Sequence, residues 1–199
     1  MLLAAGTEEG NGVSRRVAAT RIVDLEDPTF SCEVNQFPIE LVKATGGLIG
    51  QTPFVCGGMK GHTSSKACYV LEEENGEWKE DHIAALNGER SIAATGSVII
   101  NDKLVLAGGF DGIKEMSTIE MVAPNTRSSI LPIELPFGMS GSCIVPWDNN
   151  TFLVIGGGAY SGRKETYFLT AGGIDAVLRM IKLLGSYKLF PQLVKMSHL

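Results

Sequence analysis

Thiols bind metals, form disulfides and act as nucleophiles, so the four cysteines are the first residues to consider for chemistry. Cys32, Cys56, Cys68 and Cys143 are scattered, and no two of them form a C-x-x-C pair. This spacing indicates neither a zinc site nor a thioredoxin-like redox motif. We expect buried, reduced thiols in strands. A Cys56–Cys68 disulfide across a hairpin is the alternative if the protein is secreted.

The other reactive side chains form no recognisable catalytic or metal-binding group. The three histidines, His62, His82 and His198, are isolated, and the four tyrosines lack the neighbouring histidines that a copper site would need. The glycine-rich segment 157–162 precedes Arg163 and Lys164 instead of the Lys and Ser or Thr of a phosphate-binding loop. We therefore predict no catalytic residue, no metal and no cofactor, and expect that the protein is not an enzyme.

Composition narrows the classes of partner. The chain has 199 residues, of which 44% are hydrophobic and 20% charged, with a net charge of −5. This acidic balance argues against nucleic acid, which needs clustered Lys and Arg. No apolar run reaches the roughly 18 residues of a membrane helix, and residues 1–12 lack the features of a signal peptide. We expect a cytoplasmic protein with no membrane partner; a glycan at Asn149, which begins a glycosylation sequon, would favour secretion instead.

A short apolar run that ends in glycine occurs four times and must position any binding residues. The copies are Leu2–Gly6, Phe54–Gly58, Leu104–Gly109 and Phe152–Gly157. Their last glycines are 52, 51 and 48 residues apart. A period near 50 residues is typical of a propeller built from small four-stranded sheets, and each copy predicts the second strand of one sheet.

We therefore predict an all-β propeller of about four blades, at residues 2–37, 44–82, 93–135 and 140–169. The first blade lacks an innermost strand before Leu2, and residues 7–16 are expected to form a loop. Residues 170–199 depart from the repeat, and the spacing of Ile174, Val177 and Ile181 predicts a helical tail.

The repeat resembles the kelch family, whose pattern is an apolar strand, Gly-Gly, a variable loop, then a Tyr and a Trp. The second repeat has Gly57, Gly58, Tyr69 and Trp78. The third keeps Gly108 and Gly109 but has Ile119 and Ile130 at the aromatic places, and the fourth keeps Gly156, Gly157 and Tyr167. Arg90-Ser91 resembles the Arg that the family has before an inner strand. The resemblance covers residues 2–169.

The resemblance implies a non-enzymatic module that binds a peptide or protein through loops on one face. The residues that it places there are Lys43, Lys66, Arg90, Ser91, Asp111, Tyr160 and Arg163. Relatives act as substrate adaptors of ubiquitin ligases or bind actin. A secreted recognition protein and an enzyme on a propeller scaffold are the alternatives. Family propellers have more blades, so we also expect either a fragment, a small four-bladed ring, or self-association that covers open edges.

Overall fold

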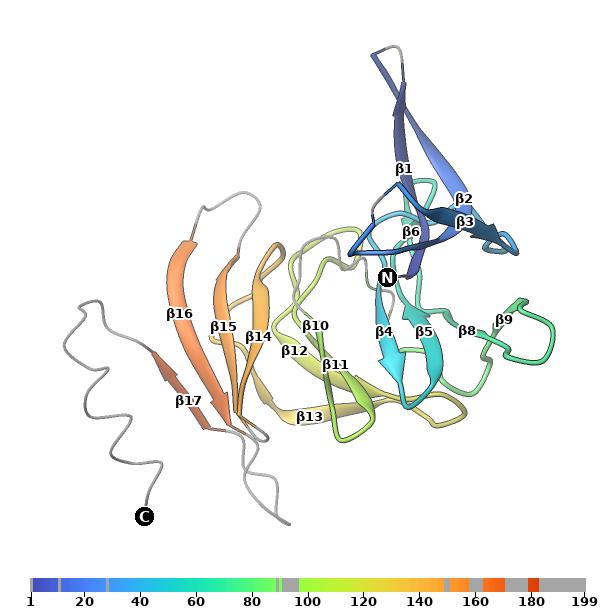
Figure 1. Ribbon diagram of the computed structural model, residues 1–199. Coiled ribbons are helices and arrows are strands. Elements are labelled where there is room, and N and C mark those ends of the chain that lie inside the picture. The colour runs from blue at the N-terminus through green and yellow to red at the C-terminus, as the bar shows by residue number, and fades with distance from the viewer. Residues whose placement is uncertain are drawn as a thin grey trace.

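The computed structural model describes residues 2–10, 12–27, 29–88, 90, 97–148, 151–157, 163–170 and 179–182. Every regular element in these ranges is a β-strand, which confirms the all-β prediction (Figure 1). In this part of the chain the strands form antiparallel sheets that follow one another along the sequence. Their orders are β1-β2-β3, β4-β5-β8-β9, β10-β11-β12-β13 and β14-β15-β16-β17, with β6 and β7 as a separate small hairpin.

The strands are short, as alternating apolar segments between glycine-containing turns predict. In the first two sheets they are β1 (Leu2–Gly10), β2 (Val13–Val23), β3 (Ser31–Val34), β4 (Thr45–Ile49), β5 (Thr52–Cys56), β8 (Cys68–Leu71) and β9 (Trp78–Glu80). The small hairpin consists of β6 (Met59–Lys60) and β7 (Thr63–Ser64). The third sheet has β10 (Ser97–Ile100), β11 (Lys103–Ala107), β12 (Thr118–Val122) and β13 (Ser129–Glu134). The fourth has β14 (Cys143–Asp148), β15 (Thr151–Gly157), β16 (Arg163–Thr170) and β17 (Arg179–Lys182).

A pair of residues with positive φ marks the same place in all four sheets. The φ angles are 67° and 93° at Gly57–Gly58, 78° and 114° at Gly108–Gly109, and 64° and 114° at Gly156–Gly157. Ala5–Gly6 has the same signature, with 55° and 127°. This left-handed backbone favours glycine, which explains the recurrence of Gly-Gly in the sequence.

Hydrogen bonds support this equivalence. The amide of the second residue in a pair donates to a carbonyl of the segment that leads into the next sheet. These bonds run from Gly6 to Leu41 (2.9 Å), from Gly58 to Arg90 (2.9 Å) and from Gly109 to Met139 (2.7 Å). Leu41, Arg90 and Met139 are therefore equivalent connector residues, and all three are fully buried.

The same equivalence assigns β1 to the second position of its sheet, because the other pairs directly follow β5 and β11 and end β15. In the described chain the first sheet has a second, third and fourth strand, and β1 pairs with β2 alone.

The innermost strands of the other sheets pack face to face, β4 on β10 and β10 on β14. Ile99 of β10 covers Gly47 of β4 so closely that a Cβ on Gly47 would collide with it. A separate cluster of buried side chains fills each space between neighbouring sheets. The three clusters are centred on Phe37, Tyr69 and Trp78, on Phe54, Leu104 and Leu106, and on Ile119, Met139 and Tyr167.

The predicted helical tail is wrong where the structure describes it. Arg179–Lys182 forms β17, which pairs with β16 from Tyr167↔Lys182 to Thr170↔Arg179. The open edge of β16 offers backbone partners, and such tertiary pairing overrides a weak helical periodicity. Thr170 ends β16. Residues 171–178 and 183–199 lie outside the described residues.

Candidate functional site

Three segments that follow the positive-φ pairs lie next to one another. They are the end of the β1–β2 hairpin, residues 57–67 and residues 108–117, and we call them the loop face. Ser64 Oγ donates to the carbonyl of Phe110 at 3.2 Å, which joins the second and third segments. A Cβ at Gly61 would lie 4.0 Å from Nη1 of Arg16, so the first and second segments are also neighbours. Loops on rigid sheets that meet on one face are a common basis for binding sites.

The predicted loop at residues 7–16 is wrong, because most of it belongs to β1 and β2. The register pairs Thr7 with Arg16, Glu8 with Arg15, and Gly10 with Val13. Gly12, with a φ of 75°, lies in the turn. Val13, Ser14 and Arg15 are exposed, and an exposed polar hairpin shows none of the apolar alternation that reveals a half-buried strand.

Exposed cations gather at the loop face. Lys66, predicted to contact a partner, is exposed on the second segment. Lys43, also predicted, is exposed beside this segment, because its neighbour Val42 bridges to Met59 of β6. The sequence analysis missed Lys60 and Lys114, which are also exposed on these segments. At the opposite ends of the strands, the turns carry mainly acidic residues: Asp24, Glu26, Asp27, Glu72, Glu73, Glu74, Glu77 and Asp102. Among the described side chains, cations outnumber the acidic residues Asp111 and Glu115 on the loop face, whereas the opposite turns, which also carry Lys79, Lys103 and Arg127, are mainly acidic.

Asp111 shapes the third segment of the loop face. Its carboxylate accepts hydrogen bonds from the amides of Lys114 (2.7 Å) and Ile113 (2.8 Å). These backbone donors, Lys114 first, lower the pKa of Asp111 below its ordinary value. The resulting turn presents Ile113 with 90% of its surface exposed. An exposed aliphatic side chain at a loop tip is suited to contact with another protein.

Arg90 is not available to a partner, which corrects the prediction for this residue. Its side chain is only 1% exposed. The guanidinium donates to the carbonyls of Gly108 (2.9 Å) and Thr118 (3.2 Å) and to Oγ1 of Thr118 (2.8 Å), and it forms an ion pair with Glu120 at 3.2 Å. Burial lowers the pKa of Arg90, and the charge of Glu120 opposes that shift. Arg90 therefore joins the second sheet to the third.

Glu120, and not Ile119 as predicted, is the counterpart in the third sheet of Tyr69 and Tyr167. Val55, Leu106 and Val154 are each three residues before the second glycine of their pair. On the neighbouring strand, Val55 pairs with Tyr69, Leu106 with Glu120, and Val154 with Tyr167. Tyr69 packs edge to face with Phe37, and Tyr167 with Phe137. Glu120 instead receives Arg90 and the amide and side chain of Asn87. At this position the middle joint between sheets is thus ionic, whereas the two neighbouring joints have aromatic pairs there.

The other predicted residues divide into two groups. Trp78 is buried and donates from Nε1 to Oγ1 of Thr20 at 3.1 Å, which joins the first two sheets. Ile130, predicted at the place of Trp in the third sheet, is half exposed and does not fill that role. Arg163 was predicted in a loop, but it begins β16 opposite Gly157. Ser91 and Tyr160 lie outside the described residues.

Cys56 and Cys68 are direct partners across β5 and β8 and form a disulfide. It closes the segment that carries β6 and β7. Cys32 and Cys143 are free and exposed. Among the described residues no three His, Cys, Asp or Glu side chains are placed to hold a metal ion. In the same part of the chain no helix is long and apolar enough to cross a membrane.

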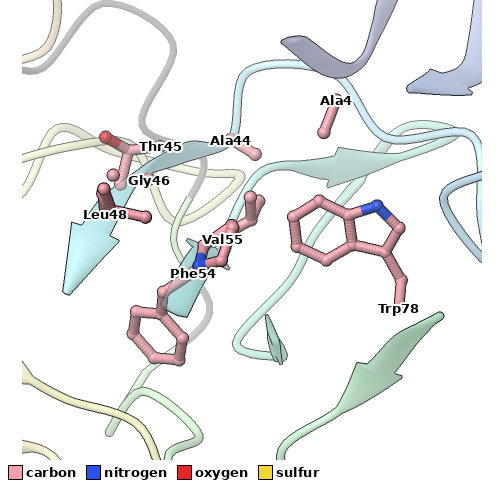
Figure 2. Close-up of a pocket in the computed structure, with 10 residues that line it drawn as sticks. Ala4, Ala44, Thr45, Gly46, Leu48, Phe54, Val55 and Trp78 are labelled. Carbon is pink, nitrogen blue, oxygen red and sulfur yellow. The ribbon is translucent and has the colours of Figure 1, made fainter. Parts of the chain in front are cut away.

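Two clefts lie at the first sheet. A polar cleft of about 740 Å³ separates the β1–β2 hairpin from the connector to β4. Its polar side chains are those of Thr7, Arg15, Arg16, Arg21, Gln36 and Glu40. An apolar cleft of about 480 Å³ lies between Ala4 of β1, the face of β4 and Trp78 (Figure 2). None of the ten residues that line the apolar cleft is charged.

Comparison with solved structures finds 156 matching chains. One of them is the structure of YjhT, with a TM-score of 0.63 and 17% sequence identity over 84% of this chain. YjhT has a β-propeller-like fold, and at this identity the match shows a shared fold alone. This chain spans about half of the YjhT structure, 52% of its length. No protein-family profile matches the sequence. No curated protein sequence matches it either.

Proposed function

We propose that this protein is a non-enzymatic interaction module of the kelch type, with four blades, which binds a peptide or protein partner through the loop face. The observation that carries the proposal is the contact between three successive loop segments on one face, with exposed lysines and an exposed Ile113. Cations and apolar side chains on a rigid scaffold provide charge steering together with buried contact area. The kelch assignment is supported by the repeated Gly-Gly pairs, Tyr69, Trp78 and Tyr167.

The resemblance extends the proposal to the type of partner. Substrate recruitment for a ubiquitin ligase or binding to actin, both in the cytoplasm, are the roles that related modules suggest. Each role needs a protein-binding face and no catalytic group, and either would use the same loop segments.

A secreted recognition protein is the second candidate, and the Cys56–Cys68 disulfide is the observation that favours it. Disulfides persist mainly in oxidising compartments. The discriminating measurement is the number of free thiols in protein isolated from its natural source under conditions that block exchange. Two free thiols support the secreted candidate, and four support the cytoplasmic one.

The binding proposal is tested by charge reversal on opposite ends of the sheets. The loop-face variant is Lys60→Glu with Lys66→Glu, and its matched control is Lys103→Glu with Arg127→Glu on the opposite turns, where both residues are exposed. Immobilised wild type and both variants are incubated with a cell extract, and retained proteins are identified by mass spectrometry. We expect at least one protein that wild type and control retain and the loop-face variant loses. Identical sets from all three would contradict the proposal.

A further inference from the structure

An exposed hydroxyl group lies among the cations of the loop face. Thr63 is exposed in the β6–β7 hairpin, where it pairs with Lys60 across the ladder. Residues paired in this way point to the same side of a hairpin, with their Cβ atoms about 5 Å apart. The side chains of Thr63 and Lys60 are therefore neighbours in solvent. Lys66, on the same segment, is exposed as well.

The two hydroxyl groups that follow Thr63 are less accessible. Ser64 is buried, and its Oγ donates to the carbonyl of Phe110 at 3.2 Å. Ser65 is half-buried, and its Oγ accepts a hydrogen bond from the amide of Ala67 at 3.1 Å. Of these three consecutive hydroxyl residues, Thr63 alone is exposed to a modifying enzyme.

The flanking cations indicate which class of enzyme can modify Thr63. Lys60 stands three residues before Thr63, and Lys66 stands three residues after it. A protein kinase with an acidic substrate groove is electrostatically complementary to a hydroxyl group that has a cation on each side. The segment therefore combines an accessible acceptor with the charges that such a kinase selects.

The chain contains an internal comparison for this assignment. Ser117 also follows a lysine, Lys114, by three residues. It is half-buried, and its Oγ donates to Oε2 of Glu134 at 2.7 Å. A kinase has to break this hydrogen bond and uncover the hydroxyl group, so we expect slow modification of Ser117. Thr166 follows Arg163 by three residues, and its side chain lies outside the described residues.

A phosphate on Thr63 would have a second cation nearby, from another sheet. Arg16 of β2 places its Nη1 4.0 Å from the position of a Cβ on Gly61, so the guanidinium lies beside the turn of the β6–β7 hairpin. A phosphothreonine carries a charge of about −1.5 to −2 at neutral pH and accepts charge-assisted hydrogen bonds from Lys and Arg. It can thus connect the first and second segments of the loop face. Asp111 and Glu115, on the third segment, are the carboxylates that oppose it.

We propose that Thr63 is phosphorylated by a protein kinase that selects cations on both sides of its target, and that Lys60 and Arg16 hold the phosphate. The γ-phosphoryl group of a nucleoside triphosphate is transferred to Oγ1 of Thr63. The new P–O bond forms as the bond to the β–γ bridging oxygen breaks, the nucleoside diphosphate leaves, and the hydroxyl proton passes to a carboxylate of the kinase.

Phosphorylation also changes what the loop face presents to a partner. The charge of the phosphate roughly cancels the charges of Lys60 and Lys66. The attraction of this segment for the carboxylates of a partner is thereby lost. This consequence rests on the proposed function, whereas the phosphorylation site does not.

The first experiment compares rates of phosphorylation in the folded chain and in peptides. The full chain and synthetic peptides of residues 57–67 and 111–121 are incubated with the catalytic domain of protein kinase C, Mg²⁺ and ATP, and mass spectrometry maps each site. An exposed hydroxyl group needs no local unfolding, so we expect Thr63 to react within about threefold of its rate in the peptide, and Ser117 at least about tenfold more slowly than in its peptide. A tenfold slower reaction of Thr63 in the chain, or none in chain and peptide, would overturn the site.

The second experiment measures whether the fold holds the phosphate. Phosphorus NMR gives the second pKa of the phosphothreonine in the chain and in the peptide of residues 57–67. Nearby cations favour the dianion, and the peptide keeps both lysines, so we expect a pKa lower by at least about 0.3 in the chain. Arg16→Gln should remove most of this difference, and Arg21→Gln, further along the same strand, is the matched control that should preserve it. Equal pKa values in the chain and the peptide would overturn the role of Arg16.

The consequence for binding is tested with the same cell extract as the charge-reversal variants. The immobilised proteins are the unmodified chain, the phosphorylated chain, and Thr63→Val after treatment with the kinase. We expect the phosphorylated chain to lose the proteins that Lys60→Glu with Lys66→Glu also loses, and Thr63→Val to retain them. Full retention by the phosphorylated chain would overturn the regulatory role. If no form retains a protein, the proposed function fails, and the two preceding experiments still decide the phosphorylation site.

Discussion

Arg90→Met is the most informative single substitution, because it replaces the cation of the ion pair between the second and third sheets with an apolar side chain. Met139 is the connector residue of the next joint and is fully buried there. Methionine retains most of the length of arginine but provides no donor. The substitution leaves the carboxylate of Glu120, itself fully buried, without its cation. The carbonyls of Gly108 and Thr118 lose their guanidinium donor as well.

The expected loss follows from these contacts. Removing one partner of a buried ion pair costs about 3–5 kcal/mol of unfolding free energy, because an unpaired charge stays in the interior. Adding Glu120→Gln removes that charge at constant volume and keeps an oxygen to accept from Asn87. We therefore expect the double variant to be about 2–3 kcal/mol more stable than Arg90→Met alone, within the range measured for coupled neighbours. In the wild-type background Glu120→Gln should destabilise instead.

Urea unfolding followed by tryptophan fluorescence and by circular dichroism measures all four proteins of this cycle. The slope against urea should stay constant, so that midpoints report stability. If Glu120→Gln lowers the stability of Arg90→Met, or leaves it unchanged, then Glu120 is not an unpaired buried carboxylate in that variant. That result would refute the ionic joint. Arg90→Lys serves as a control that keeps the charge but loses the planar fork of donors.

Three further predictions concern the backbone and the crosslink. Ala5→Gly should stabilise the chain by about 0.5–1 kcal/mol, because relief of left-handed strain outweighs the added entropy of glycine; a lower urea midpoint would contradict the assigned φ of 55°. Gly108→Ala should destabilise by more than about 2 kcal/mol, since its φ is 78° and a Cβ would collide with the carbonyl of Met139; an unchanged thermal midpoint would be inconsistent with this packing. Reduction of Cys56–Cys68, in a Cys32→Ser and Cys143→Ser background, should lower the unfolding free energy by about 3 kcal/mol for a 12-residue separation, and equal stability with and without reductant would argue that no crosslink forms.

The all-β fold was predictable because the backbone conformation that repeats in each sheet selects a particular residue type. A positive φ selects glycine, so the Gly-Gly pairs mark the same backbone position wherever they occur. Ala5–Gly6 has the same positive φ angles, but its first residue is an alanine. This pair is therefore harder to recognise in the sequence than a Gly-Gly pair.

The errors arise where tertiary partners decide. Arginine is a residue type that often binds ligands, so the sequence alone suggests that Arg90 is exposed. Its burial follows from the ion pair with Glu120 of the next sheet, which the sequence does not reveal. The β1–β2 hairpin is polar and therefore looks like a loop, whereas its backbone pairing gives it structure. For Arg179–Lys182, the edge of β16 determines a strand that periodicity alone assigned to a helix.

The loop face was predictable in part. The position of the loops after each glycine pair follows from the repeat, and Lys66 is exposed there, with Lys43 beside it. The exposure of Lys60 on the loop face depends on the small hairpin of β6 and β7. The exposure of Ile113 depends on the turn that Asp111 caps. Neither of these local structures has a strong sequence signal, because two-residue strands and carboxylate-capped turns occur in many contexts.

Site-specific photocrosslinking tests the central claim, that a partner binds the loop face, most directly. A photoreactive amino acid replaces His62, which is exposed in the β6–β7 turn, or Gln51, which is exposed in the β4–β5 turn at the opposite end of the sheet. Irradiation in a cell extract, followed by mass spectrometry, identifies the crosslinked proteins at each position. Our account predicts a specific protein adduct at position 62 that is absent at position 51. The same adducts at both positions, or an adduct at position 51 alone, would contradict it.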